Sequence, residues 1–252
     1  MLRPYRKIPF TRIIFKHYRQ LESNGMIRKL LLFDIDGTLL HSKGASREAK
    51  ALAMEEVFGT SANVRTHAFG GKTDWQILRE VLKPHGVTGI EIGQKMPTFE
   101  RVFAKNMAKI IPNFDVETLP GVTDLLAYLE QRDDIMLGIV TGNTSLTAPV
   151  KLKAAGIDPA MFTVGAFGSE ADDRNELPKL ALDRAIAHAR QEISGADVII
   201  IGDTVKDVEA ARAIGGVAVT VFTGFEERQL LIDSKPDYML DDLTSFRTIV
   251  PL

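Results

Sequence analysis

Residues 30–39 read Leu-Leu-Leu-Phe-Asp-Ile-Asp-Gly-Thr-Leu, in which a continuous apolar run at 30–33 is followed by two aspartates, Asp34 and Asp36. A short apolar run without alternation is typical of a strand that is buried on both faces of a parallel sheet. Similar runs recur along the chain with helical patterns between them, and this repeated order of strand and helix predicts an open α/β sheet. The expected strands are Leu30–Phe33, Ile135–Val140, Thr163–Gly165, Val198–Ile201, Val217–Val221 and Tyr238–Leu240.

A long helical stretch interrupts this order directly after the first strand. Residues 44–116 show mostly helical patterns and no convincing strand, and about seventy residues are too many for a loop inside a compact domain. We therefore expect an inserted helical subdomain at 44–116 and an α/β core made of 26–43 and 117–252. The expected helices of the insertion are Ala49–Phe58, Trp75–Leu82 and Phe99–Ile111, and those of the core lie near 122–131, 145–155, 177–191, 205–214 and 226–233.

The composition excludes several classes of protein. Of the 252 residues, 45% are hydrophobic and 25% are charged, which is ordinary for a chain that folds around an apolar core. The lack of cysteine excludes disulfides, a thiolate nucleophile and a cysteine-based zinc site. A net charge of −2 gives no case for a nucleic-acid partner, and no apolar run approaches the length of a membrane span. These features predict a cytoplasmic protein without a nucleic-acid or membrane partner.

The first 25 residues form a basic leader. They hold six lysine or arginine residues against Glu22, a net charge of +5, whereas the remaining chain sums to −7. A transit peptide or an anion-binding arm would fit this charge. However, Met26 directly precedes the first strand pattern, and this favours a basic N-terminal extension at 1–25 that lies outside the functional domain.

Carboxylates follow two of the expected strands. Asp34 and Asp36 come directly after the first strand, Asp203 and Asp207 follow the fourth, and Thr141 ends the second. Ligands of open α/β sheets bind beyond the carboxyl ends of the strands, so we expect these side chains to surround one spot. Clustered carboxylates repel one another unless a cation is present, and an oxygen-only set favours Mg²⁺. The sequence therefore predicts a magnesium site.

The positions of these residues indicate how they divide the chemistry. Asp34, at the strand tip, is best placed to bind the metal and to attack an electrophile. Asp36 lies two residues further on, where it can reach a leaving-group oxygen as a general acid and then as a base. Gly37 permits the tight backbone path that this requires. The hydroxyl of Thr141 and a cation from the loop after the third strand would hold the oxygens of a transferring phosphoryl group.

These motifs carry a resemblance to a known family. The run Asp-x-Asp-Gly-Thr-Leu at 34–39, a strand that ends in Thr141, and Gly-Asp-Thr-x-x-Asp at 202–207 resemble the haloacid dehalogenase superfamily. The helical insertion after the first motif is similar to phosphatases of the phosphoglycolate phosphatase type. The resemblance covers about residues 28–245 and implies a Rossmann-like open parallel sheet with an inserted α-helical cap.

The resemblance also implies roles for individual residues. Asp34 would be the nucleophile that becomes a phosphoaspartate, and Asp36 would be the general acid and base. Mg²⁺ would be held by Asp34, the backbone carbonyl of Asp36 and Asp203, with Asp207 as a ligand or a supporting residue. Thr141 would contact the phosphate.

The third motif of the family, a lysine that is usually followed by proline, is not matched cleanly. The region reads Asp172-Asp173-Arg174-Asn175-Glu176-Leu177-Pro178-Lys179. Lys179 stands at a family-like distance before Asp203, but a helix that begins near Asn175 would contain it. Arg174 would then point into the site from the loop and could bind phosphoryl oxygens bidentately. We expect one of the two cations to be catalytic, and Arg174 is favoured.

Other polar residues are candidates for substrate binding. Lys72 follows Gly70-Gly71 in the insertion and could meet an anionic group, although the same segment reads equally well as a helix N-terminus with Thr73 or Asp74 as its cap. Gly142 and Asn143 share the loop of Thr141 and could touch substrate, while Asn143 could instead cap the next helix. The side chains that we interpret as surface residues are Lys151, Lys153, His41, His67, His85 and His188.

The function predicted from these features is Mg²⁺-dependent hydrolysis of a small phosphorylated metabolite. A phosphomutase of the β-phosphoglucomutase type would use the same residues, although the Gly-Val often found after the second aspartate in that group is absent. A dehalogenase has no use for the acid at Asp36. A non-catalytic phospho-ligand sensor that uses Asp34 as a phosphorylation switch needs neither the insertion nor Asp36, which disfavours that alternative.

Overall fold

The computed structural model describes residues 26–252, and the predicted basic extension at 1–25 lies outside the described residues. Six strands form one sheet in the order β5-β4-β1-β6-β7-β8, and every neighbouring pair is parallel. The predicted fold class, an open parallel α/β sheet, is confirmed. The strands are β1 (Lys29–Phe33), β4 (Ile135–Thr141), β5 (Val164–Phe167), β6 (Val198–Gly202), β7 (Val217–Val221) and β8 (Tyr238–Leu240).

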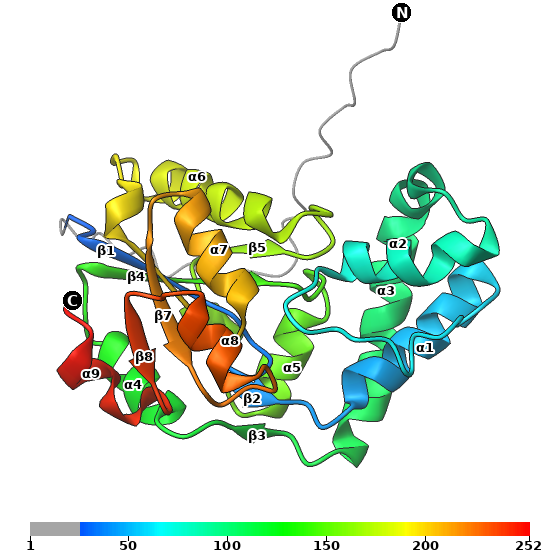
Figure 1. The fold of residues 1–252 in the computed structure, drawn as a ribbon, viewed down its shortest axis with the longest axis horizontal. Coiled ribbons are helices and arrows are strands. Elements are labelled where there is room, and N and C mark those ends of the chain that lie inside the picture. The colour runs from blue at the N-terminus through cyan, green and yellow to red at the C-terminus, as the bar shows by residue number, and fades with distance from the viewer. Residues whose placement is uncertain (1–25) are drawn as a thin grey trace, which may run out of the picture.

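Helices cover both faces of this sheet (Figure 1). One face packs against α6 (Leu177–Ala189) and α7 (Val205–Ala213). The other face packs against α4 (Val122–Leu129), α5 (Ala148–Ala154) and α9 (Phe246–Ile249). Because apolar side chains point to both faces, the strands are continuous apolar runs, as expected for a parallel sheet. The remaining core helices are α8 (Arg228–Asp233) and the 3-10 helices Pro159–Met161, Arg174–Glu176, Gly195–Asp197 and Leu243–Ser245.

A helical insertion lies beside the core and has an apolar core of its own (Figure 1). It leaves the core through β2 (Leu40–His41) and returns through β3 (Glu117–Thr118), which pair as a short antiparallel ribbon. The sequence pattern does not predict this ribbon, because two residues are too few to show a strand pattern. The insertion contains α1 (Ala45–Phe58), α2 (Asp74–Leu82), α3 (Gly89–Ile110) and the 3-10 helices Lys83–His85 and Ile111–Asn113.

Helix α3 begins ten residues earlier than the predicted Phe99. Gly93 and Pro97 caused the error, since glycine and proline normally weaken a helix interior. The helix begins instead at Gly89 and is capped by Thr88, whose hydroxyl accepts a hydrogen bond from the Glu91 amide. Gly93 allows close packing here, because a Cβ atom there would lie 3.1 Å from the Trp75 ring and the ring would have to shift.

The position of β1 determines where ligands can bind. It is a central strand, with β4 on one side and β6 on the other, so the carboxyl ends of all three meet. Chain connections diverge on either side of β1, which is the usual place for a ligand site in an open α/β sheet. Among residues 26–252, no helix has the length and apolar character needed to cross a membrane.

Candidate active site

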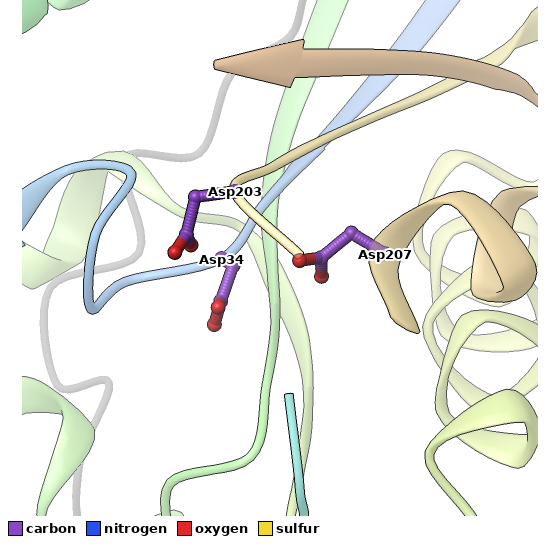
Figure 2. Close-up of side chains that lie close together, drawn as sticks. All are labelled: Asp34, Asp203 and Asp207. Atoms are coloured by element: carbon purple, nitrogen blue, oxygen red, sulfur yellow. The ribbon is translucent and has the colours of Figure 1, made fainter. Parts of the chain in front are cut away.

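Three carboxylates converge at the carboxyl end of the central strands. Asp34 follows β1, Asp203 follows β6, and Asp207 lies in the first turn of α7. All three side chains are buried, and one oxygen of each lies within 4.8 Å of the others. Figure 2 shows that they reach this place from separate elements. We call Asp34, Asp203 and Asp207 the carboxylate cluster.

Close backbone packing holds the carboxylate cluster together. The Asp34 amide donates to the Ile201 carbonyl at 2.9 Å, which continues the pairing of β1 with β6. Gly37 has a φ of 84°, and a Cβ atom there would lie 2.3 Å from a carboxylate oxygen of Asp203. The Thr38 hydroxyl donates to that carboxylate at 3.1 Å. The turn after β1 therefore requires glycine at position 37 in order to close over Asp203.

Asp207 is fixed by the helix that carries it. One of its oxygens accepts hydrogen bonds from the Thr204 amide at 3.0 Å and from the Thr204 hydroxyl at 2.7 Å. A carboxylate in the first turn of a helix satisfies free amides and interacts favourably with the helix dipole. Its other oxygen contacts Arg174. Asp207 therefore both caps α7 and orients the arginine.

The carboxylate cluster carries more negative charge than its surroundings balance. Burial raises the pKa of Asp34 to about 6, with Arg174 opposing this shift and Asp207 adding to it. Burial and the neighbouring charges of Asp34 and Asp207 raise the pKa of Asp203 well above its usual range. A bound cation relieves such repulsion, and an oxygen-only donor set suits Mg²⁺. The residues present therefore fit a magnesium ion.

Arg174 is the cation that the structure places at the carboxylate cluster. It begins the 3-10 helix Arg174–Glu176, and its guanidinium lies 3.1 Å from Asp34 and also contacts Asp207. Its side chain is 3% exposed, and its Nε has no hydrogen-bond partner among the described residues. Burial alone would lower the pKa of Arg174, but Asp207 and Asp34 raise it, so the charge is secure.

Lys179 does not reach the site, which corrects one of the two predicted third-motif cations. Its side chain is 64% exposed and pairs with Asp183 one turn further along α6. The reason is the position of the helix start. Because α6 begins at Leu177, Lys179 already lies on the solvent face of its first turn.

Asp36 has surroundings that differ from those of Asp34. Its carboxylate accepts hydrogen bonds from Ser42 at 3.0 Å, from Asn143 at 2.8 Å and from Lys151 at 2.6 Å. Burial alone would raise the pKa of Asp36, but Lys151, Asn143 and Ser42 outweigh burial and lower it. Among the described residues, its carboxylate is not part of the group that could hold a metal through side chains. The structure thus separates the two aspartates of the first motif.

The interpretation of Lys151 as a surface residue was wrong. The residue is 1% exposed, and its ammonium bonds both Asp36 and the side-chain oxygen of Asn143, each at 2.6 Å. Lys151 lies one helical turn after Thr147, which is also buried. Polar residues four apart on one helix face that begins near a strand end were the signal that could have revealed it. Lys153 is exposed, as predicted.

The loop after β4 joins the two parts of the site. Thr141 is fully buried, its hydroxyl accepts a hydrogen bond from Asn143 at 2.8 Å, and its contact with Asp34 works against the rise in the pKa of that carboxyl. Gly142 lies where a Cβ atom would be 2.1 Å from the Lys72 carbonyl oxygen. The three predicted residues of this loop therefore lie at the site, and Gly142 permits the insertion to approach it.

The side chain of Lys72 is engaged away from the carboxylate cluster. Its ammonium lies 2.6 Å from Glu80 and 3.3 Å from His67, within the helical insertion. His67 also bonds Glu80, at 2.8 Å, and is half-buried rather than at the surface as predicted. In this arrangement only the backbone of Lys72 faces the core.

The chain is similar to proteins of known family. Residues 28–215 match the family of haloacid dehalogenase-like hydrolases. A phosphoglycolate phosphatase from Synechococcus elongatus is 30% identical over 84% of this chain and 92% of its own length. The pyrophosphatase PpaX of Listeria monocytogenes is 23% identical, over 87% of this chain and 95% of its own length.

Solved structures show the same fold. The structure of CbbY from Rhodobacter sphaeroides in complex with phosphate has a TM-score of 0.63. The matched region covers 88% of this chain and 96% of the CbbY chain, at 18% sequence identity. The likeness extends over the sheet and the helical insertion together, because nearly the whole of each chain is matched.

Proposed function

The chain belongs to the haloacid dehalogenase-like hydrolases, and we propose that it hydrolyses a small phosphomonoester through a phosphoaspartate formed on Asp34. The membership and the curated relatives confirm the family resemblance and the enzyme class expected from the sequence, a phosphoric monoester hydrolase. The substrate, the metal and the covalent intermediate are our proposal. We expect the enzyme to act in the cytoplasm on a small phosphorylated metabolite.

The observation that carries the proposal is the contrast between Asp34 and Asp36. The first is buried in the carboxylate cluster beside Arg174, and the second is held apart by Lys151, Asn143 and Ser42. Two carboxyl groups in different surroundings are typical of an active site that divides nucleophilic and acid–base work. A single carboxylate switch would not need the second arrangement.

In the first half of the reaction, an oxygen of Asp34 attacks phosphorus in line with the leaving oxygen, and Asp36 protonates that oxygen. The Arg174 guanidinium and the Thr141 hydroxyl both contact Asp34, so they are placed to bind the phosphoryl oxygens as charge shifts between them. The Nε of Arg174 supplies one donor that no atom of residues 26–252 uses.

In the second half, Asp36 accepts a proton from water, which attacks phosphorus and releases Asp34. Lys151 favours the ionised form of Asp36 that this step needs, as the lowered pKa of Asp36 indicates. Asn143 and Ser42 hold the carboxylate in one orientation throughout. Lys151 therefore acts as a positioning residue for the general base.

The carboxylate cluster and the backbone carbonyl of Asp36 would hold Mg²⁺. When bound, the ion would neutralise charge on the transferring phosphoryl group and keep Asp34 ionised. The fit rests on three buried carboxylates that, within residues 26–252, pair with one guanidinium, an arrangement that leaves negative charge unbalanced.

We propose that the helical insertion at 44–116 acts as a cap. The backbone amides of Asp74 and Trp75 donate to the carbonyls of Gly142 at 2.7 Å and Gly168 at 2.9 Å. Glu100 accepts hydrogen bonds from Ser145 and Ser169 at 3.0 and 2.6 Å. These contacts hold the insertion over loops that follow two core strands, where it excludes water from the reacting groups.

The test is phosphate release from a panel of small phosphoesters, with Mg²⁺ and with excess EDTA. We expect release that requires Mg²⁺ and a rise in the melting temperature when Mg²⁺ is added to the wild-type protein. Asp203→Asn should abolish that rise, because it removes a ligand. If the folded wild-type enzyme releases phosphate from none of the esters, the proposal is wrong. Product analysis with a hexose 1-phosphate separates hydrolysis from transfer within the sugar.

A further inference from the structure

A second buried ion pair lies in the helical insertion, outside the groups used so far. Lys50 of α1 and Asp74 at the start of α2 are 1% and 3% exposed, and the lysine ammonium bonds one carboxylate oxygen of Asp74. Burial lowers the pKa of Lys50, and Asp74 opposes that shift. Desolvating two charges is costly, so a buried pair of this kind needs a reason beyond stability.

This pair lies against the loop that holds the general base. The other oxygen of Asp74 accepts a hydrogen bond from the Thr144 amide at 3.0 Å, and the Asp74 amide donates to Gly142. Asn143, between these two residues, bonds Asp36. Lys50 also interacts electrostatically with Asp36. The Lys50 ammonium is therefore close enough to interact with the charges of Lys151 and of Asp36, the residue proposed to protonate the leaving group.

The hydrogen-bond donors of the Lys50 ammonium are not all satisfied by the residues that the structure describes. A lysine ammonium has three hydrogen-bond donors, and its only hydrogen-bond acceptor among residues 26–252 is Asp74. The rings of Phe69 and Phe103 face it at 4.0 and 5.6 Å, and rings stabilise a cation without replacing a charged acceptor. A buried donor that lacks an acceptor costs free energy, which an anionic ligand would recover.

We propose that Lys50 determines specificity by binding a negatively charged group, a carboxylate or a second phosphate, on the leaving group of the substrate. The inference rests on the proposed phosphatase function. Asp74 orients the ammonium through its bonds to the core loop and partly neutralises it, so that a leaving group without charge gains nothing from the contact. The preferred substrates are phosphoesters and anhydrides whose leaving group is itself an anion.

The test compares three substrates that differ in the leaving group. Phosphoglycolate carries a carboxylate, pyrophosphate carries a second phosphate, and ethyl phosphate is the uncharged counterpart of phosphoglycolate. For each protein, kcat/KM on either charged substrate is divided by kcat/KM on ethyl phosphate. The variant Lys50→Met/Asp74→Asn removes both charges together and leaves no unpaired buried ion, while the asparagine oxygen can still accept from Thr144. Lys105→Met, an exposed lysine of α3, is the matched control.

We expect the ratio to exceed one for at least one charged substrate in the wild-type enzyme and in Lys105→Met. In the double variant it should fall by about tenfold or more, the usual effect of a hydrogen bond to a charged group. The single variant Asp74→Asn should raise the ratio, because the carboxylate no longer competes for the ammonium. The charged substrate whose ratio falls in the double variant shows whether Lys50 binds a carboxylate or a second phosphate.

A ratio that the double variant leaves within twofold of the wild-type value would overturn the inference. The same holds for a wild-type enzyme that hydrolyses all three substrates equally well. In both cases, turnover of ethyl phosphate keeps the proposed phosphatase function intact. Loss of the phosphatase function itself would appear instead as no phosphate release from any of the three by the folded wild-type protein.

Discussion

Arg174 in the core and Lys50 in the helical insertion are both buried cations. They differ in the number of carboxylates that surround them. Arg174 touches Asp34 and Asp207, and Asp203 completes the carboxylate cluster, so negative charge is left over. Lys50 has Asp74 as its only ion-pair partner among the described residues, and that pair is balanced. The first arrangement needs a further cation, whereas the second leaves an ammonium with donors to spare. Charge balance therefore distinguishes the carboxylate cluster, the proposed metal and phosphoryl site, from the Lys50–Asp74 pair, the proposed leaving-group site.

The largest effect should come from Asp34→Asn, which tests the unbalanced side of this comparison. Loss of the nucleophile should lower kcat for phosphate release about a thousandfold or more. In the absence of metal the variant should melt no lower than the wild-type protein, because one of several repelling buried charges is gone. Steady-state kinetics measure kcat, and thermal unfolding without metal measures the melting temperature. Appreciable turnover by this variant would contradict a phosphoaspartate mechanism.

Arg174→Ala should have the next largest effect, and Lys179→Ala is its matched control. Removing the guanidinium should lower kcat about a hundredfold, the range found when a donor to a transition-state charge is lost. It should also lower the melting temperature without metal, since Asp34 and Asp207 then lie buried without a counter-charge. Lys179→Ala should stay within about twofold of wild type, because its side chain is exposed. The reverse order would reassign the third motif to Lys179.

Lys151→Met tests whether the general base needs its own cation. We expect kcat to fall about tenfold, because the carboxylate of Asp36 loses the contact that holds it in position. The affinity for Mg²⁺, measured by calorimetry, should change little, since Lys151 has no contact with the carboxylate cluster. Lys153→Met, two residues along the same helix and exposed, is the control. Equal activity of both variants would show that Asn143 and Ser42 are sufficient to hold the carboxylate of Asp36 in position.

The smallest expected effect is on the stability of the insertion and concerns Glu80. Its carboxylate accepts hydrogen bonds from Lys72, His67 and Gln76. Burial would raise its pKa, but these bonds lower the pKa of Glu80 to about 2. A lowered pKa stabilises the fold above the unfolded value of about 4.3, and this contribution is lost as the pH falls toward 2. Glu80→Gln should therefore lose about 1 kcal/mol or less at pH 7, the range for partly exposed pairs.

Urea denaturation of wild type and Glu80→Gln at several pH values between 7 and 2.5 measures this difference. The difference in free energy of unfolding between the two proteins should shrink as the pH falls below about 4.3. Glu56→Gln, an exposed change on α1, is the control and should track the wild-type protein throughout. A difference that stays constant or grows in acid would mean that Glu80 does not stabilise the fold through its ionised form.

Most of the fold could be predicted because burial determines both the pattern and the structure. β7 and β8 have the bounds expected from their apolar runs, and β1 extends by one residue. The errors lie where local rules conflict with tertiary packing. Gly93 weakens a helix locally but makes room for Trp75, so α3 continues through it. The ribbon of β2 and β3 exists through pairing across the insertion, which no local pattern records.

The sequence by itself determined the succession of strands and helices along the chain, the four aspartates that follow two of the strands, and the resemblance to a hydrolase family. Spacing along the chain suffices there, since side chains at the ends of parallel strands must meet. Only the tertiary structure decided that Arg174 and not Lys179 faces the carboxylate cluster, that Lys151 supports Asp36, and that Lys50 is buried with Asp74. The physical reason is that a lysine or arginine has the same pattern in sequence whether it is hydrated or buried. Its partner comes from a distant segment, and packing alone determines which carboxylate it meets.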